Sequence, residues 1–442
     1  MLEEFQRGIY CRLVRRTCSP ALLTEKRTTY RMHSIRFSII LRGMTLVLTI
    51  AIMANVASAA SREKVLYTFT GGADGGDTSS AVISDKAGNL YGMTYSGGAN
   101  GQGTVFELEL SNGRWTEVVI HSFNYDGVDG YSPEGGLIMD KAGNLYGATM
   151  FGGSQNYGTV FELSPTSNGW TESVLYSFTG GNDGGVPGVG SLVFDGEGSL
   201  YGTTLGGGTY GYGVVFELSP SSGGWMETVL HNFAETTSDG GSPTSVVFDR
   251  KGNLYGTTAQ GGTYGRGSVF KLSRSIKGSW KETVLHDFAE DNQDGGHPVS
   301  GVTVRGGDLF GTTENGGPYA WGTIYELTRV GNHWKKILLD RFSANGVDGF
   351  APECVVIFDK AGNLYGTTYS GGKYGYGTVF ELTRSTTGWK QKLLHSFNGT
   401  TDGGFLPFGV IKDGKGNLYG TTQCGGSARD CSGYGVVFEI LQ

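Results

Sequence analysis

The hydrophobic and polar positions of this chain repeat a pattern that predicts short β-strands. In residues 190–233, Leu192-Val193-Phe194 is a short apolar run, as expected of a strand covered on both faces. After a tight turn comes Leu200-Tyr201-Gly202-Thr203-Thr204, and after a glycine-rich loop comes Val214-Val215-Phe216-Glu217-Leu218. From Trp225 to Phe233 the residues alternate, which predicts a longer fourth strand. The face of this strand that the alternation groups together holds Trp225, Glu227, Val229, His231 and Phe233. The unit is therefore a four-stranded antiparallel meander, and no segment has a convincing helical period.

A hairpin, complete in residues 359–368, recurs seven times along the chain. Its aromatic residue stands at Tyr91, Tyr146, Tyr201, Tyr255, Phe310, Tyr365 and Tyr419. The steps between these positions are 55, 55, 54, 55, 55 and 54 residues. Seven such units, rich in glycine and aromatic residues, indicate an all-β, seven-bladed β-propeller of four-stranded antiparallel blades.

The two ends of the repeat region complement each other. Residues 64–69 match the fourth strand at 173–178, whereas residues 436–440 match a third strand and end the repeat region. The last blade thus lacks its fourth strand, and the N-terminal strand can supply it. This arrangement predicts a closed ring without open sheet edges.

The unit Asp-x-x-Gly-Asn-Leu-Tyr-Gly-Thr-Thr, followed by Gly-Gly and Gly-Thr-Val-Phe-Glu-Leu, resembles the GloVer tandem repeat. The resemblance covers residues 63–442. It implies membership of a family of secreted or surface bacterial proteins, the choice-of-anchor repeat proteins, with which no general activity or catalytic residue is associated. One departure is that Gln442 directly follows the last strand, without an apolar tail, which favours release from the cell over anchoring.

Residues 1–60 differ from the repeats and read as an N-terminal extension with a secretory signal peptide. Arg36 and Arg42 precede an apolar run of 13 residues, 44–56, which is followed by Ala57-Ser58-Ala59. The run is short for a membrane span, so an uncleaved anchor is the weaker alternative. Translation from Met32 or Met44 would retain the signal. We expect a secreted, extracellular protein, with the periplasm as the alternative location, and residues 61–442 as its propeller domain.

The net charge disfavours some classes of binding partner, and the cysteines bear on disulfide pairing. Removing the nine basic and three acidic residues of positions 1–60 from the 34 and 41 of the whole chain leaves a net charge of −13. This charge disfavours nucleic acid and anionic membrane surfaces. Cys424 and Cys431 could pair in an oxidising compartment, and Cys354 reads as a buried apolar residue. We expect a monomer with no cofactor and no metal, whose partner is an extracellular polysaccharide or a surface protein.

Two sets of residues recur on the rim where the loop between the second and third strands meets the loop between blades. The first is a ring of aspartates that either hold cations or sugar hydroxyls or, as the turn chemistry favours, cap their own turns: Asp74, Asp129, Asp183, Asp239, Asp294, Asp348 and Asp402. The second is a set of aromatic residues among glycines: Tyr157, Tyr210, Tyr212, Tyr264, Tyr319, Trp321, Tyr374, Tyr376 and Tyr434. These rings either stack on a ligand or pack between blades.

Candidate catalytic residues are few. His121, His231, His286 and His395 share one register on separate blades, so they cannot converge on one metal ion, and a role between blades is favoured. The fifth repeat loses its usual Asp turn and places His297, Glu314 and Trp321 on its rim, which makes His297 and Glu314 the weak catalytic candidates. We favour a non-enzymatic binding propeller that engages polysaccharide. The alternatives are a polysaccharide lyase or hydrolase at the same rim, and a scaffold for protein partners.

Overall fold

The computed structural model describes residues 62–442 except 189, 277, 292, 406–408 and 427–431. The predicted signal peptide and the start of the chain lie outside the described residues, as does Cys431, the predicted partner of Cys424. Cys424 is half of a disulfide bond. Within the described part of the chain no helix occurs that is long and apolar enough to cross a membrane.

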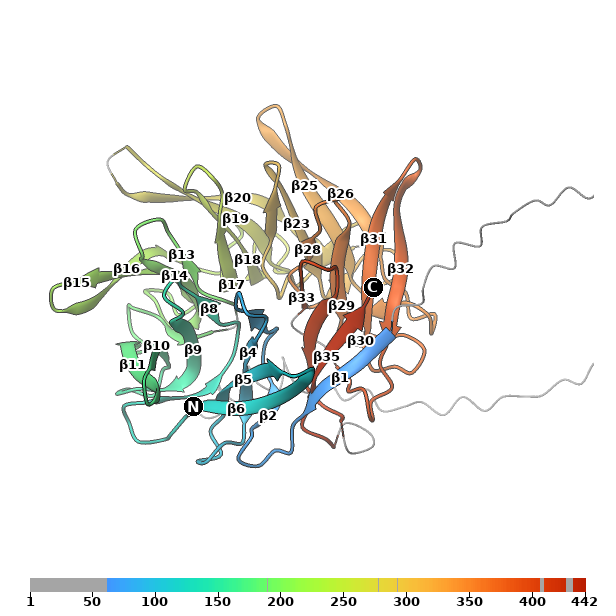
Figure 1. Ribbon diagram of the computed structural model, residues 1–442. Coiled ribbons are helices and arrows are strands. Elements are labelled where there is room, and N and C mark those ends of the chain that lie inside the picture. The colour runs from blue at the N-terminus through green and yellow to red at the C-terminus, as the bar shows by residue number, and fades with distance from the viewer. Residues whose placement is uncertain (1–61, 189, 277, 292, 406–408, 427–431) are drawn as a thin grey trace, which may run out of the picture. The chain divides into compact units, whose positions relative to one another are not determined.

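Seven antiparallel sheets form the blades of a β-propeller, as the repeat predicts (Figure 1). Blade 1 contains β2 (Gly76–Thr78), β3 (Ile83–Ser84), β4 (Leu90–Ser96), β5 (Thr104–Ser111) and β6 (Arg114–Ser122). Blade 2 contains β7 (Gly130–Pro133), β8 (Ile138–Met139), β9 (Leu145–Gly152), β10 (Thr159–Thr166) and β11 (Gly169–Ser177). Blade 3 contains β12 (Gly185–Pro187), β13 (Val193–Phe194), β14 (Leu200–Gly206), β15 (Val214–Ser221) and β16 (Gly224–Asn232). Blade 4 contains β17 (Gly240–Phe248), β18 (Leu254–Gly261), β19 (Ser268–Arg274) and β20 (Trp280–Asp287).

The remaining three blades follow the same order. Blade 5 contains β21 (Gly295–Gly296), β22 (Thr303–Arg305), β23 (Asp308–Thr313), β24 (Asn315–Gly316), β25 (Thr323–Val330) and β26 (His333–Arg341). Blade 6 contains β27 (Gly349–Phe350), β28 (Ile357–Phe358), β29 (Leu364–Thr368), β30 (Ser370–Gly371), β31 (Thr378–Ser385) and β32 (Gly388–Ser396). Blade 7 contains β33 (Val410–Lys412), β34 (Leu418–Thr422), β35 (Val436–Leu441) and β1 (Arg62–Thr68).

The ring closes through β1, as the sequence predicts. This strand pairs antiparallel with β35, from Arg62 opposite Leu441 to Thr68 opposite Val436, so the first strand of the described chain completes the last blade (Figure 1). The core lies between adjacent blades. In blade 1, for example, Phe106 and Leu108 are fully buried and cluster with Phe69, which follows β1, and Val437 of β35. Each such layer joins two blades, because a single sheet cannot bury both of its apolar faces alone.

Each outermost strand carries a β-bulge, and this corrects one prediction. In β16, Val229 pairs with Phe216 but His231 pairs with Val215, so Leu230 is the extra residue. The bulge reverses the alternation, and His231 lies on the opposite face from Trp225, Glu227 and Val229. The sequence predicted one face for all of them because an inserted residue leaves composition and spacing unchanged. A bulge at the same place occurs in all seven outer strands.

The innermost strand of most blades is broken into two short segments, of which the sequence predicted only the second. In blade 3 the first segment is β12, which pairs with the far end of β14, whereas β13 pairs with its near end. Val186 in β12 has a φ of +59° and precedes Pro187, a combination that interrupts a regular strand.

Candidate functional site

The rim that carries the predicted site residues, called rim A below, contains the loops between the second and third strands and the loops between blades. At the start of each first strand one non-glycine residue adopts a left-handed φ of 51–59°. These residues are Asp77, Ser132, Val186, Ser242, His297, Ala351 and Phe405. Such a conformation costs of the order of 1 kcal/mol and persists only where its surroundings impose it.

A hydrogen bond between blades imposes this conformation. The N–H of each left-handed residue donates to a carbonyl in the preceding blade, over 2.8–3.0 Å. The seven accepting residues are Tyr434, Gln102, Tyr157, Tyr212, Arg266, Trp321 and Tyr376. The same backbone arrangement therefore presents six different side-chain types around rim A. A binding surface needs side chains that differ in chemistry while the backbone positions that carry them stay the same.

The predicted aromatic residues fall into two structural classes. Those in the accepting register pack against the backbone between blades, and Tyr212, Trp321 and Tyr434 also keep 40%, 39% and 41% of their surface exposed. A Cβ placed on Gly180 would lie 2.4 Å from the ring of Tyr157, one on Gly399 would lie 2.6 Å from Tyr376, and one on Gly71 would lie 2.3 Å from Tyr434. Glycine is required at these positions because the rings lie directly on the backbone. Trp321 contacts Phe350 at a centroid separation of 4.7 Å, and Tyr212 lies near Gly241.

The other class is a row of four exposed tyrosines, called the tyrosine arc. Tyr210, Tyr264, Tyr319 and Tyr374 are 59%, 60%, 56% and 49% exposed. They occupy equivalent places in the loops of blades 3, 4, 5 and 6, which are consecutive. The glycines that follow three of them, Gly211, Gly265 and Gly375, would meet no other atom within 4 Å if they carried a Cβ. The space beside these rings is therefore open.

The aspartates of rim A are engaged in hydrogen bonds that hold the loops between blades. Asp74 accepts the Thr70 N–H at 2.8 Å, and Asp239 accepts the Ala234 N–H at 3.0 Å. A side chain of the fourth strand also contacts the aspartate, such as Tyr67 for Asp74 at 3.1 Å and His231 for Asp239 at 3.3 Å. The remaining contacts of this kind are His121 with Asp129, Tyr176 with Asp183, His286 with Asp294, and His395 with Asp402. Asp348 instead accepts from Ser343 and Asn345.

The two catalytic candidates lie close in the backbone but face different partners. The imidazole of His297 contacts the carbonyl of Ala259 at 3.1 Å and Arg266 at 3.2 Å, and it lies 3.6 Å from Glu290. The N–H of Glu314 donates to the His297 carbonyl at 3.1 Å. The Glu314 carboxylate, however, interacts with Glu353 of the next blade.

Glu353 is a residue that the sequence analysis missed. Burial raises its pKa well above the usual range for glutamate, and the negative charge of Glu314 raises it further. The corresponding residue of blade 2 is Glu134, whose pKa burial raises to about 7. A Pro-Glu dipeptide in the first strand, at 133–134 and 352–353, was the available signal. A carboxyl with a raised pKa beside a second carboxyl is an arrangement that general acid–base chemistry can use.

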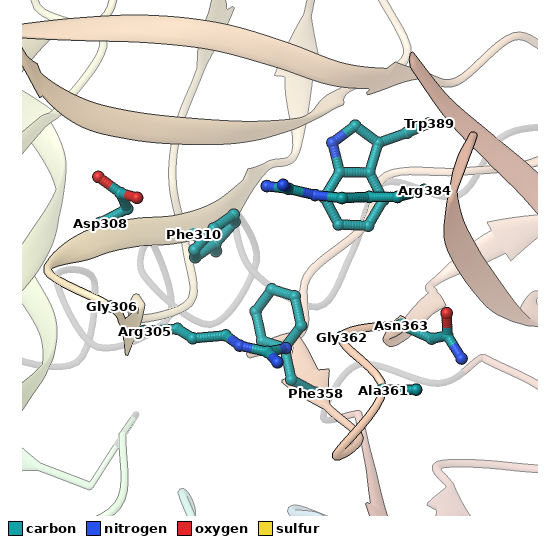
Figure 2. Close-up of a pocket in the computed structure, with 10 residues that line it drawn as sticks. All are labelled: Arg305, Gly306, Asp308, Phe310, Phe358, Ala361, Gly362, Asn363, Arg384 and Trp389. Carbon is teal, nitrogen blue, oxygen red and sulfur yellow. The ribbon is translucent and has the colours of Figure 1, made fainter. Parts of the chain in front are cut away.

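A pocket of about 400 Å³ opens on the opposite rim, between blades 5 and 6 (Figure 2). It arises where the fifth repeat departs from the pattern. Arg305 replaces the turn aspartate and lies 4.5 Å from the Phe358 ring centroid, and Phe310 replaces the hairpin tyrosine. Figure 2 shows Arg384 lying across Trp389, with 5.0 Å between the guanidinium and the ring. Asp308 also lines the pocket, so the pocket carries both positively and negatively charged side chains.

Comparison with known proteins identifies the repeat. The model of the Gloeobacter/Verrucomicrobia repeat matches residues 52–196, 171–292 and 275–442. The chain belongs to this family. No curated protein is significantly similar to this chain. Among solved structures, an ancestral GH74 enzyme has a TM-score of 0.52 at 13% identity, with 83% of this chain and 48% of that chain covered. The repeat protein thus spans about half the length of that enzyme. The phage phi92 endosialidase has a TM-score of 0.43 at 12% identity, with 86% and 68% covered. At 13% identity the likeness to the GH74 enzyme concerns the fold alone.

Proposed function

We propose that this propeller is an exported carbohydrate-binding protein that binds an extended polysaccharide along the tyrosine arc. The observation that carries the proposal is the placement of four exposed tyrosines at equivalent positions of four consecutive blades. A polysaccharide presents the apolar faces of its sugar rings at regular intervals, and a tyrosine ring offers a flat apolar surface with a polar tip. A row of repeated stacking positions matches a ligand that is itself a repeat.

Each stacking contact is expected to contribute about 1 kcal/mol, by analogy with aromatic pairs. A single Tyr→Ala change in the arc should then weaken binding about fivefold. The variant in which all four tyrosines of the arc are replaced by alanine should bind too weakly to detect. Tyr125 is the matched control, because it is 67% exposed and lies in the loop between blades 1 and 2, outside the arc. Tyr125→Ala should leave the affinity unchanged.

The test is binding of the full chain to a panel of soluble and insoluble polysaccharides, with reducing ends measured in the same samples. Binding that is lost in the arc variants and kept in Tyr125→Ala supports the proposal. Binding that survives the fourfold substitution contradicts it. The export inference, which rests on residues 1–60, is checked by N-terminal sequencing of the protein recovered from the culture medium.

A second candidate function is a hydrolase or lyase acting on the same polymer. It is favoured by the carboxyl pair of Glu314 and Glu353, in which burial and mutual repulsion raise the pKa of Glu353. In this mechanism Glu353 would donate a proton to the leaving group and Glu314 would act as base or nucleophile. Glu353→Gln should then abolish release of reducing ends, whereas Glu134→Gln, at the same register of blade 2, should not. The sequence analysis named His297 as an acid–base candidate together with Glu314, and His297→Ala tests that hypothesis.

A further inference from the structure

The junction between each pair of neighbouring blades repeats one arrangement of polar side chains. The turn aspartate lies between the histidine or tyrosine of one outer strand and a residue of the next outer strand. At five junctions this last residue is a glutamate, and its Oε1 is buried without a hydrogen-bond partner among the described residues. The five are Glu63, Glu117, Glu172, Glu227 and Glu282. Two carboxyl groups thus lie near each other in a partly buried interface.

The junction between blades 4 and 5 shows what this arrangement accommodates. There, Lys336 stands at the glutamate position, and its ammonium contacts the Asp294 carboxylate directly. Lys336 is also largely buried, with 9% of its side chain exposed. The chain itself therefore places a cation against the turn aspartate at one of the seven junctions.

The junction between blades 1 and 2 has a turn aspartate with a buried oxygen that accepts no N–H group in the described part of the chain. Asp129 is 8% exposed, and its Oδ2 accepts the Asn124 N–H at 2.9 Å and contacts His121 Nε2 at 3.2 Å. Its Oδ1 is buried and accepts no N–H group in the described part of the chain, and the Glu172 carboxyl is its polar neighbour. In the related junction with His231, both oxygens of Asp239 accept backbone N–H groups, from Gly240 and Ala234.

We propose that a divalent transition-metal ion, with Zn²⁺ as the reference ion, binds between blades 1 and 2 to His121, Asp129 and Glu172. One ligand atom from each of these residues lies within 4.8 Å of the others, and in the described part of the chain no other such group occurs. One imidazole nitrogen and two carboxylates form a ligand set that zinc accepts, with a fourth position left for water. Bonds of about 2.0 Å require ligand atoms roughly 3.3 Å apart, so the carboxylates need only a small inward shift.

Electrostatics favour the same ion. Ligand atoms of Asp129 and Glu172 lie within 4.8 Å of each other in a mostly buried interface, where two negative charges repel. A divalent ion would neutralise both charges and would join β6 to β11. The site would hold two blades together and lies away from the tyrosine arc.

The experiment uses the full chain, freed of metal by chelation and titrated with ZnCl₂ in a calorimeter near neutral pH. Co²⁺ serves as a spectroscopic probe, because its visible absorption reports nitrogen and oxygen ligands in low coordination. We expect one ion per chain, a rise in melting temperature on binding, and loss of both effects in Glu172→Gln. Glu227→Gln is the matched control, since its junction has Tyr176 in place of histidine and should not contribute to binding.

Two further variants protect the test against misfolding. His121→Tyr introduces the residue that this chain already uses at positions 67 and 176, and it should fold without binding zinc. Glu172→Lys copies the junction of Lys336, so it should bind no zinc and should melt above the metal-free wild type. The proposal is overturned if the wild-type chain binds no zinc, or if binding persists in both Glu172→Gln and His121→Tyr.

Discussion

The hydroxyl group of Tyr91 offers a precise test of how polar groups hold a blade together. It donates to Glu107 Oε1 at 2.8 Å, and it lies 3.4 Å from Asp85 Oδ2. Asp85 keeps three other donors, the N–H groups of Gly88 and Asn89 and the side-chain amide of Asn89. When Tyr91 is replaced by phenylalanine, the main loss is therefore the hydrogen bond to the Glu107 carboxylate. The ring, which is 5% exposed and packs against Trp170, stays in place.

The expected magnitude follows from this geometry. A hydrogen bond to a charged group contributes about 1.5–3 kcal/mol, and because Glu107 is only partly buried we take the lower end. For about 380 folded residues the unfolding entropy is roughly 0.8 kcal/mol/K, so Tyr91→Phe should lower the melting temperature by about 2 °C. Differential scanning calorimetry resolves a shift of this size.

The effect should depend on pH with a definite sign. Burial raises the pKa of Glu107 above its usual range, and the hydrogen bond from Tyr91 opposes that rise by stabilising the carboxylate. The stabilisation is therefore present where Glu107 is ionised, at about pH 8, and is lost as the pH falls through the pKa of the carboxyl. A destabilisation of Tyr91→Phe that is absent at pH 8, or equally large at about pH 4, would refute this reasoning.

Three other perturbations test separate parts of the structure. Phe310→Tyr restores the missing hydroxyl of blade 5 near Glu326, and it should stabilise the protein by about 1 kcal/mol in chemical denaturation, whereas an unchanged midpoint would contradict this. Glu117→Gln removes a carboxyl whose pKa burial and then Asp74 raise to about 7, so it should stabilise the protein by about 1 kcal/mol at pH 8, after discounting for solvent exposure. In the wild type, the ionised Glu117 carboxylate destabilises the fold only above the usual pKa of glutamate. The added stability of Glu117→Gln should therefore shrink as the pH falls below 7 and vanish below about 4.5, as thermal melts across pH would show. Deleting residues 1–68 removes β1 and exposes the edge of β35, so the variant should melt several degrees lower and aggregate by light scattering, and normal melting would argue against closure.

The architecture was predictable from the sequence because the pattern of each strand and turn occurs in seven copies. The run Leu364-Tyr365-Gly366-Thr367-Thr368 becomes β29, and the match between residues 64–69 and a fourth strand correctly predicted that β1 would close the ring. Glycine, aromatic residues and alternation specify strands and turns locally. Agreement among seven copies then removes the ambiguity of any one of them.

The candidate site was less predictable because it depends on features without a composition signal. The bulge that moves His231 to the opposite face adds a residue that looks like any other strand residue. The left-handed position of rim A is filled by residues as different as Asp77, His297 and Phe405, so no residue type marks it. Glu314 and Glu353 belong to neighbouring blades, and their spacing along the chain does not predict that their charges interact.

Distinguishing the exposed tyrosines of the arc from the tyrosines that pack between blades also required the structure. Tyr210 and Tyr212 are two residues apart in one glycine-rich loop, and the sequence treated them alike. The carbonyl of Tyr212 accepts a hydrogen bond from the next blade, which holds that residue at the junction with 40% of its surface exposed, whereas Tyr210 is 59% exposed.

The measurement that tests the central claim most directly is polysaccharide binding by the wild-type chain and by the variant in which Tyr210, Tyr264, Tyr319 and Tyr374 are all alanine. Both proteins should show the same melting temperature, because the four rings lie exposed on loops. The account predicts that the wild-type chain retains at least one polysaccharide of the panel and that the variant retains none of it. Equal retention by the two proteins, at equal stability, would contradict a binding role for the tyrosine arc.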